Sequence, residues 1–307
     1  MSAGWIAGGV RARALLRRRV GAAGTREVAA CPSLADALGL LVTGPYQRDV
    51  RVGQTLEEAE HAVGSTLLWH LRVVAGWQPR AGAELVRLLA GWFEVANVLE
   101  HVRSLLGAEA GPLYRLGTLA TAWPRLATTT SLADLRSGLA ASPWGDPGAE
   151  NPWEVVMGMQ LGWATRLAQG VPQVRAWAAG GAALVVARAQ YVLDRTVPEP
   201  ALRRVVALLG VDPAKSASLA AFTRQLPSEA RWALADIDSP AELWQAEERW
   251  WVRVEQDALA LLRRPGFGPD PVVGCAALLT VDARRVRAAL ELAARGGRPL
   301  EAFDAMA

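Results

Sequence analysis

Three long stretches of the chain carry apolar residues at helical spacing. In residues 85–106 these residues follow one another at intervals of three and four: Leu85, Leu88, Trp92, Val95, Leu99, Val102 and Leu106. Residues 174–192 and 272–293 repeat this pattern. The spacing places apolar side chains on one face of an α-helix. No segment shows sustained alternation of apolar and polar residues, so the sequence predicts an all-α protein without significant sheet.

Residues that start, stop or bend helices accompany these stretches. Gly107 follows the first stretch as a C-terminal stop. Asp270 is expected to cap the third helix, with Pro271 at its first position. The middle stretch contains Gly180 and Gly181, where we expect close packing or a bend.

A short motif occurs three times in the same order along the chain. Ser33 and Ser131 each begin the tetrapeptide Ser-Leu-Ala-Asp, and Ser239 begins a looser copy, Ser-Pro-Ala-Glu. Each serine is placed to cap a helix, and each carboxylate three residues later lies near the exposed N–H groups of the first turn. The motif therefore predicts three helix starts of one kind.

Aromatic residues extend the match beyond the motif. Twelve residues after Ser33 and Ser131 the chain continues with Pro-Tyr and Pro-Trp, and the third copy has Trp250-Trp251 in the corresponding place. We interpret the copies as three diverged helical repeats, spanning residues 1–110, 111–210 and 211–307. Unrelated helix caps are the alternative, because helix starts of this type are common.

Composition and charge define the class of protein. The chain has 307 residues, of which 51% are hydrophobic and 21% charged, as in an ordinary globular protein. Its two cysteines, Cys31 and Cys275, are far apart and lack metal-ligand spacing, so we expect reduced, buried thiols and a cytosolic compartment. The most apolar run, residues 176–187, is too short to cross a bilayer, and the N-terminus lacks the pattern of a signal peptide.

The sequence offers no assembled active site. It has three histidines, with His61 and His70 on one predicted helix that begins at the Thr55 cap, and His101 on another. We expect them to be partly exposed polar residues. Metal-binding histidine pairs, phosphate-binding glycine loops and nucleophile motifs are absent from the sequence. The prediction is therefore that the chain has no catalytic residue, no cofactor and no metal.

Arginines form two dense clusters. All basic residues except Lys215 are arginines, for which GC-rich codon usage is the simplest explanation. One cluster lies near the N-terminus and one on the last predicted helix: Arg11, Arg13, Arg17, Arg18 and Arg19, then Arg284, Arg285 and Arg287. A solvated helix face, contact with an acidic protein surface, and contact with nucleic acid or anionic lipid remain open for both clusters.

The C-terminal third carries a recognisable pattern. Residues 255–259 read Glu-Gln-Asp-Ala-Leu, and residues 266–273 read Gly-Phe-Gly-Pro-Asp-Pro-Val-Val. An arginine-bearing helix follows at residues 283–290, and then Gly296 to Pro299. This ending resembles that of the C-subunit family of archaeal and bacterial V-type ATPases, the counterpart of the eukaryotic d-subunit.

Two further segments are similar to that family. Residues 10–16 look like its N-terminal Arg-x-Arg helix, and residues 93–103 look like a first-repeat helix with an Asn and an Arg. The resemblance implies three helical repeats with pseudo-threefold symmetry in a funnel-shaped molecule without a catalytic site. It suggests partner-binding roles for a small set of residues: Arg11, Arg13, Asn97, Arg103, Arg284 and Arg287.

The resemblance also implies partners and a location. The family's members sit between the central rotor shaft and the membrane proteolipid ring of a rotary ATPase and transmit torque. We accordingly expect a peripheral protein on the cytoplasmic side, which meets the membrane only through the ring and binds neither nucleic acid nor a small-molecule substrate. An α-helical repeat scaffold or regulator with an unrelated partner is the first alternative; a nucleic-acid-binding protein and a helical enzyme are the others.

Overall fold

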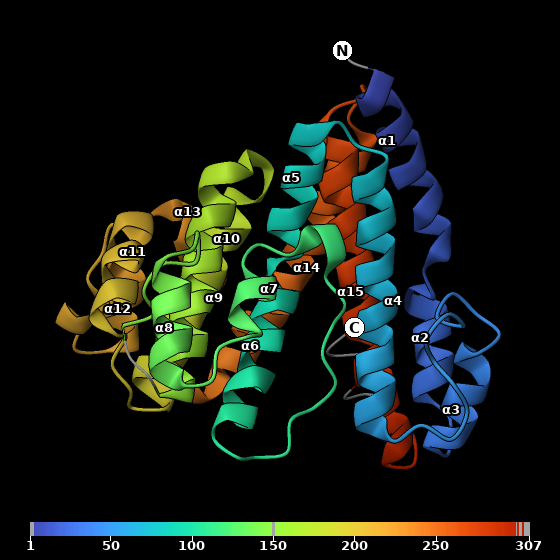
Figure 1. The fold of residues 1–307 in the computed structure, drawn as a ribbon, viewed down its shortest axis with the longest axis horizontal. Helices are drawn as coiled ribbons and strands as arrows, with labels where there is room; N and C mark the ends of the chain where they lie inside the picture. Colours follow the sequence, from blue (N-terminus) through green and yellow to red (C-terminus); the bar gives the residue numbers. More distant parts are fainter. Residues whose placement is uncertain (1–2, 149–150, 299, 301–302, 304–307) are drawn as a thin grey trace. The chain divides into compact units, whose positions relative to one another are not determined.

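Every regular element in the described part of the chain is a helix (Figure 1). The computed structural model describes residues 3–148, 151–298, 300 and 303. The prediction of an all-α fold is confirmed. The chain forms two compact units: Met1–Val86 with Glu255–Ala307 is unit 1, and Arg87–Val254 is unit 2. The repeat boundaries after residues 110 and 210 do not coincide with these limits and stay a prediction.

Unit 1 joins the two ends of the chain. Its helices are α1 (Ala3–Leu15), η1 (Leu16–Arg18), α2 (Gly21–Ala29), α3 (Leu34–Leu41), α4 (Leu56–Gly76), most of α5 (Arg80–Leu89) and α15 (Pro269–Ala294). Helix α15 packs against α1, α2, α3 and α4 (Figure 1). Its predicted apolar stripe is buried throughout: Val272, Ala276, Leu279, Ala283, Val286, Leu290 and Ala293. This stripe provides the centre of the unit 1 core.

Unit 2 contains the middle of the chain. Its main helices are α6 (Gly91–Leu105), α7 (Trp123–Leu126), α8 (Leu132–Ala140), α9 (Pro152–Gly170), α10 (Arg175–Ala187), α11 (Glu199–Leu209), α12 (Leu219–Gln225) and α13 (Ser228–Arg231). Helix α14 (Leu243–Arg263) continues from it into unit 1. One buried cluster unites α6, α7, α8 and α9: Val95, Val98, Val102, Leu126, Leu135, Leu139, Trp144, Val155 and Met159.

The periodicity of residues 85–106 predicts a single helix, and this prediction is wrong. Helix α5 ends at Leu89, and α6 begins at Gly91 after an Ala90 with φ −81° and ψ 0°. In a continuous helix the Leu88 carbonyl would accept the N–H of the residue four positions later. It instead accepts Nε1–H of Trp163 from α9, at 2.7 Å. Tertiary packing thus breaks a helix that periodicity alone continues.

The first two serine caps are confirmed. The Ser33 and Ser131 side chains accept the N–H groups of Asp36 and Asp134, and the serines have φ/ψ values of −150°/159° and −144°/162°. Ser218 has the same conformation, −153°/159°, and accepts the N–H of Ala221 at the start of α12. The sequence Ser-Leu-Ala-Ala at this point resembles the first two copies, without the carboxylate.

Ser239 is a helix cap, as predicted. It precedes a long helix, as Thr55 and Asn151 do, whereas Ser33 and Ser131 precede short helices. Its hydroxyl and Glu242 form a capping box before the short 3₁₀ helix η7 (Pro240–Glu242), which leads into α14. Thr55 forms a capping box with Glu58 at the start of the long helix α4, and the Asn151 side chain caps the long helix α9 by accepting the N–H of Glu154. Thr55, Asn151 and Ser239 follow Ser33, Ser131 and Ser218 by 22, 20 and 21 residues. Ser218 is therefore a second candidate for the third copy of the motif beside Ser239, and the three repeats stay a prediction.

The start of α15 also differs from the expectation. The helix begins at Pro269, with Gly268 in the N-cap position, so Asp270 lies in the first turn and does not cap it. The side chain of Asp270 accepts a hydrogen bond from Arg264 at 3.2 Å. Both Gly180 and Gly181 lie inside α10, and the departure from α-helical geometry comes later, in the π-helical turn η4 (Arg188–Val192).

Candidate functional site

A buried carboxylate lies at the centre of unit 1. Asp282 is on α15 and is 3% exposed. Its oxygens accept the backbone N–H groups of Val20 at 3.1 Å and Gly21 at 2.8 Å, and the Tyr46 hydroxyl at 3.0 Å. The two N–H groups belong to the exposed start of α2, where a negative charge is favoured. Asp282 therefore joins α15, α2 and the segment after α3.

Burial raises the pKa of Asp282, while the N–H groups of Gly21 and Val20 and the Tyr46 hydroxyl act in the opposite direction. The pKa of Tyr46 is also raised, first because the phenol is buried and then because the Asp282 charge lies beside it. Both carboxylate oxygens have donors, so this group is suited to holding helices together. It leaves no proton acceptor facing an accessible substrate.

A second buried carboxylate has the same arrangement in unit 2. Glu94 on α6 is 1% exposed and accepts the N–H groups of Thr121 at 2.6 Å and Ala122 at 2.7 Å, at the start of α7. Nε1–H of Trp144 donates to it at 2.7 Å. The Arg166 guanidinium lies over the Trp144 ring, 4.9 Å from its centroid. Burial lowers the pKa of Arg166, and the Glu94 charge opposes this change.

A third aromatic residue, Trp232, contacts a long helix, but no carboxylate accepts its indole N–H. Trp232 packs against Gly180 of α10, where an added Cβ would lie 2.9 Å from the indole ring. The indole N–H donates to the Glu229 carbonyl at 2.8 Å instead. Tyr46 and Trp144 each follow their capping serine, Ser33 or Ser131, by 13 residues, and Trp232 follows Ser218 by 14, so the three contacts occupy similar places in the helix order.

Sequence reasoning missed both buried carboxylates. The available signal was an acidic residue on or beside an apolar stripe: Glu94 adjoins Val95, and Asp282 adjoins Ala283. Such residues are assigned to a solvated face unless a buried partner is known, because Asp and Glu are rarely buried unpaired. The partners come from distant segments, so local pattern cannot reveal them.

The N-terminal arginines predicted to bind a partner lie on α1. Arg11 is exposed, and its guanidinium lies 5.9 Å from the Trp77 ring centroid. Arg13 is half-buried, donates to the Gly266 carbonyl at 3.4 Å, and lies 6.0 Å from the ring centroid of Phe267. Arg13 thus contacts the turn before α15, and Arg11 faces outward.

Asn97, predicted to bind a partner, lies in the interior, where its side chain is used within the chain. It is 1% exposed, donates to the Tyr114 carbonyl at 2.9 Å and accepts the Tyr114 N–H at 2.7 Å. A side-chain amide that pairs with both backbone groups of one residue fixes a segment without secondary structure. Arg103 is on the same helix, half exposed, and lies 3.6 Å from Glu100.

The arginines of α15 are used within unit 1. Arg287 is exposed and lies 3.4 Å from Glu60 of α4, and Arg284 is half-buried. Arg285 forms a bidentate pair with Glu255 at 2.7 and 2.8 Å. Of the predicted residues, Arg284 and Arg287 belong to unit 1 and Arg103 to unit 2.

One of the three histidines contradicts the expectation of partial exposure. His70 is 5% exposed, and its ring nitrogens are without a hydrogen-bond partner among the described residues. Burial lowers its pKa to about 4, and the charges of Arg18 and Arg48 add to the effect. His70 is therefore a neutral core residue at neutral pH. His101 is half-buried, as expected, and hydrogen-bonds the Thr129 hydroxyl at 2.9 Å.

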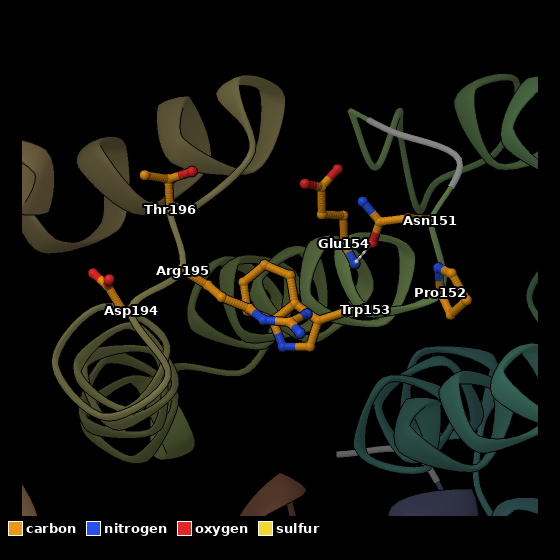
Figure 2. A pocket seen from close by; sticks show the side chains of 7 residues that line it. All are labelled: Asn151, Pro152, Trp153, Glu154, Asp194, Arg195 and Thr196. Carbon is orange, nitrogen blue, oxygen red and sulfur yellow. Dashed lines mark hydrogen bonds between the residues drawn. The ribbon is translucent and has the colours of Figure 1, made fainter.

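An open pocket of about 660 Å³ borders α9 in unit 2 (Figure 2). Its lining residues are Asn151, Pro152, Trp153, Glu154, Asp194, Arg195 and Thr196. The Arg195 guanidinium stacks over Trp153 at 4.9 Å, and the Asn151 side chain caps α9 at the N–H of Glu154 (Figure 2). The lining residues are exposed or half-buried, so their charges are in high-dielectric surroundings.

Neither a metal cluster nor a membrane-spanning helix occurs within the described residues. No group of three or more His, Cys, Asp or Glu side chains there is placed to hold a metal ion. No helix in that part of the chain combines the length and apolar character needed to span a bilayer. Cys31 and Cys275 are free and buried, as the sequence predicted.

The chain matches no protein-family model, and no curated protein matches it.

Proposed function

We propose that this chain is a non-catalytic central-stalk subunit of a V/A-type rotary ATPase, where it couples the central shaft to the membrane proteolipid ring. In this proposal it lies peripherally on the cytoplasmic side and transmits torque through its shape. The resemblance of the C-terminal segment to the C-subunit family motivates the proposal. The helix order supports the repeated architecture that such a coupler needs.

The observation that carries the proposal is the direction of the aromatic contacts. The chain passes three times through a Ser-capped short helix, a capped long helix and a second long helix. Tyr46 of the first pass contacts α15 of the third, Trp144 of the second contacts α6 of the first, and Trp232 of the third contacts α10 of the second. Each contact lies inside one unit.

These contacts favour a closed ring of three repeats. The aromatic residue of each pass contacts the last long helix of the pass before it. For the first pass, this helix is α15 of the third pass. An open array would leave the first pass without such a helix, because terminal repeats of an array contact a single neighbour. The pattern therefore supports the proposal of a pseudo-threefold funnel.

Stiffness is the second requirement of a torque coupler. Close-packed helices resist compression, because protein interiors are as dense as organic crystals. Glu94 and Asp282 add charged hydrogen bonds between segments far apart in sequence, at 2.6 to 3.1 Å. Bonds of this kind are stronger than those between neutral groups. Together these features suit a part that works by transmitting force.

Co-purification and ion uptake test the proposal. A tagged chain is expressed in its own cells in place of the endogenous copy, and membranes are solubilised in mild detergent. We expect shaft and proteolipid subunits to co-purify, and the association with the isolated ring to weaken as salt rises, because arginines meet acidic groups. Vesicles from cells lacking the chain should lose ATP-driven ion uptake, and re-expression should restore it. Unchanged uptake without recovery of shaft or ring subunits would contradict the proposal.

A helical repeat scaffold that binds an unrelated partner is the second candidate. The same packed helices and surface arginines favour it as much as they favour a coupler. The same co-purification distinguishes the two, since recovery of one unrelated protein in stoichiometric amount, with ion uptake intact, identifies a scaffold.

A further inference from the structure

Helix α1 presents an apolar face to solvent. Its small residues Gly8, Gly9 and Ala12, with Leu15, face the interior of unit 1. On the opposite side Ile6 is 42% exposed and Val10 is 57% exposed. Ala3, Ala7 and Ala14 are exposed on the same side. A helix that is apolar all round is normally covered on both faces, so this exposed face is expected to have a partner.

Arginines flank that apolar face. With 100° between successive residues, Arg13 lies at one edge of the exposed stripe and Arg11 at the other. Arg17 and Arg18 are exposed in the turn that follows α1. Six arginines precede Glu27, which is the first acidic residue of the chain. Positive charge therefore borders the stripe, and α1 itself carries no acidic residue.

Two tryptophans extend the surface onto α4. Trp77 follows the end of α4, is 53% exposed, and lies beneath the Arg11 guanidinium at 5.9 Å. Trp69 lies beneath Arg48 at 4.6 Å. The charges of Arg18, Arg48 and Arg11 add to the effect of burial in lowering the pKa of His70, whereas Asp49, which pairs with Arg48 at 3.5 Å, acts in the opposite direction. The three arginines therefore lie around one part of α4. All these residues belong to unit 1.

We propose that this surface, formed by Ile6, Val10 and Trp77 with Arg11, Arg17 and Arg18, binds the anionic lipid headgroups of a membrane. We name it the α1–Trp77 surface. The apolar side chains enter the boundary between headgroups and acyl chains, and the guanidinium groups pair with phosphates. The inference does not depend on the proposed function, because it concerns lipid and not the proteolipid ring.

The chemistry of the surface favours lipid over an acidic protein. An interfacial helix lies in the plane of the membrane with an apolar stripe bordered by Lys or Arg, and Trp is enriched at the same depth. Long arginine side chains reach from the edge of such a stripe to the phosphates while their stems cover apolar surface. The α1–Trp77 surface contains the same three kinds of group, with exposed Ile6 and Val10, exposed Trp77, and the Arg11 guanidinium 5.9 Å from the Trp77 ring centroid.

Vesicle binding tests the inference with the full-length chain. The probes are vesicles of phosphatidylcholine alone and vesicles containing roughly a third phosphatidylglycerol, a charge density sufficient to attract basic segments. We expect co-sedimentation with the anionic vesicles only. Val10→Cys labelled with a polarity-sensitive fluorophore should shift to the blue on binding. The same label at Val52→Cys, which is 64% exposed in a loop, should not shift.

Two variants separate the apolar and electrostatic contributions. Ile6→Ser with Val10→Ser should weaken binding about tenfold or more, since each exposed aliphatic side chain loses its apolar environment. Arg17→Gln with Arg18→Gln should weaken it about thirtyfold, because each arginine near an anionic surface contributes about one factor of five. Leu40→Ser with Val52→Ser, two exposed apolar residues elsewhere in unit 1, is the matched control and should leave binding unchanged. Circular dichroism checks that every variant remains helical.

Several outcomes would overturn the inference. Absence of binding to anionic vesicles is one, and equal binding to neutral vesicles is another. Binding that the Ile6→Ser, Val10→Ser pair leaves unchanged would show that charge alone attracts the protein. A dimer in sedimentation velocity that this pair dissociates would show that a second copy covers the face, and association with an acidic protein that competes with vesicles would assign the face to that partner.

Discussion

The Tyr46 hydroxyl donates a hydrogen bond to Oδ2 of Asp282 at 3.0 Å, across 236 residues of sequence. It joins the segment after the first Ser-capped helix to the last long helix, so the beginning and the end of the chain share one core. Trp144 and Glu94 form the corresponding contact in unit 2, across 50 residues. The first contact differs from the second mainly in how far apart the chain places its partners.

Tyr46→Phe is expected to destabilise the fold by about 1–3 kcal/mol, because Asp282 stays buried with one donor fewer. The free energy of unfolding from urea titration measures the loss. Tyr191→Phe is the matched control, since that hydroxyl donates to the Ser216 carbonyl in a half-buried position at 3.2 Å. It should cost less than about 1 kcal/mol. Equal losses in the two variants would mean that the Tyr46 hydrogen bond contributes no more to stability than the half-buried Tyr191 hydrogen bond.

Glu94→Gln should destabilise unit 2 by about 2–4 kcal/mol. Glutamine has one carbonyl oxygen where the carboxylate has two, so its amide N–H₂ group would face the N–H donors of Thr121, Ala122 or Trp144. Thermal melting followed by circular dichroism provides the measurement. Glu84→Gln, in the exposed pair with Arg80, should change stability by no more than about 0.5 kcal/mol.

Gly91→Ala tests the break between α5 and α6. An added Cβ would lie 2.8 Å from the Trp163 ring, and Trp163 also donates the bond that withdraws the Leu88 carbonyl from the helix. We expect a loss of about 1–3 kcal/mol from the displaced indole. Gly39→Ala in α3, where an added Cβ meets nothing within 4 Å, should stabilise by about 0.5–1 kcal/mol. A neutral Gly91→Ala would show that the indole position is adaptable.

The stability of the protein should fall as pH falls from about 6.5 toward 4, in part because of His70. Its folded pKa is about 4, against 6.5 for an unperturbed histidine. Between these two pH values the unfolded chain binds a proton at His70 that the folded chain does not bind, so protonation favours the unfolded state. The contribution between pH 7 and pH 5 is up to about 2 kcal/mol. Asp282 contributes with the opposite sign, because its folded pKa is raised.

His70→Leu isolates the histidine contribution. Urea titrations at pH 7 and pH 5 should show a smaller loss of stability in this variant than in the parent chain. His61→Gln, which replaces another histidine on the same helix, is measured in parallel for comparison. If both variants lost as much stability as the parent chain, protonation of His70 would not be the cause of the loss. The folded protein would then accommodate a charged His70 by rearrangement of the groups around it, namely Arg11, Arg18, Arg48 and Asp49.

The sequence by itself determined that the protein is helical and where many of its helices begin. The apolar stripe of α15 and the caps at Ser33, Thr55 and Ser131 were readable because they depend on residues three or four positions apart. Helix capping and amphipathic spacing are local effects, so a single sequence contains them in full.

Only the tertiary structure decided which polar residues are buried and where a periodic stretch is interrupted. Leu88 gives its carbonyl to Trp163, and Asn97 turns inward to Tyr114. Glu94 and Asp282 find their donors 27 to 262 residues away. A helix start looks the same wherever it falls in the order, and burial is a property of the neighbours that packing supplies. That information is spread over the whole chain and becomes visible when the chain is folded.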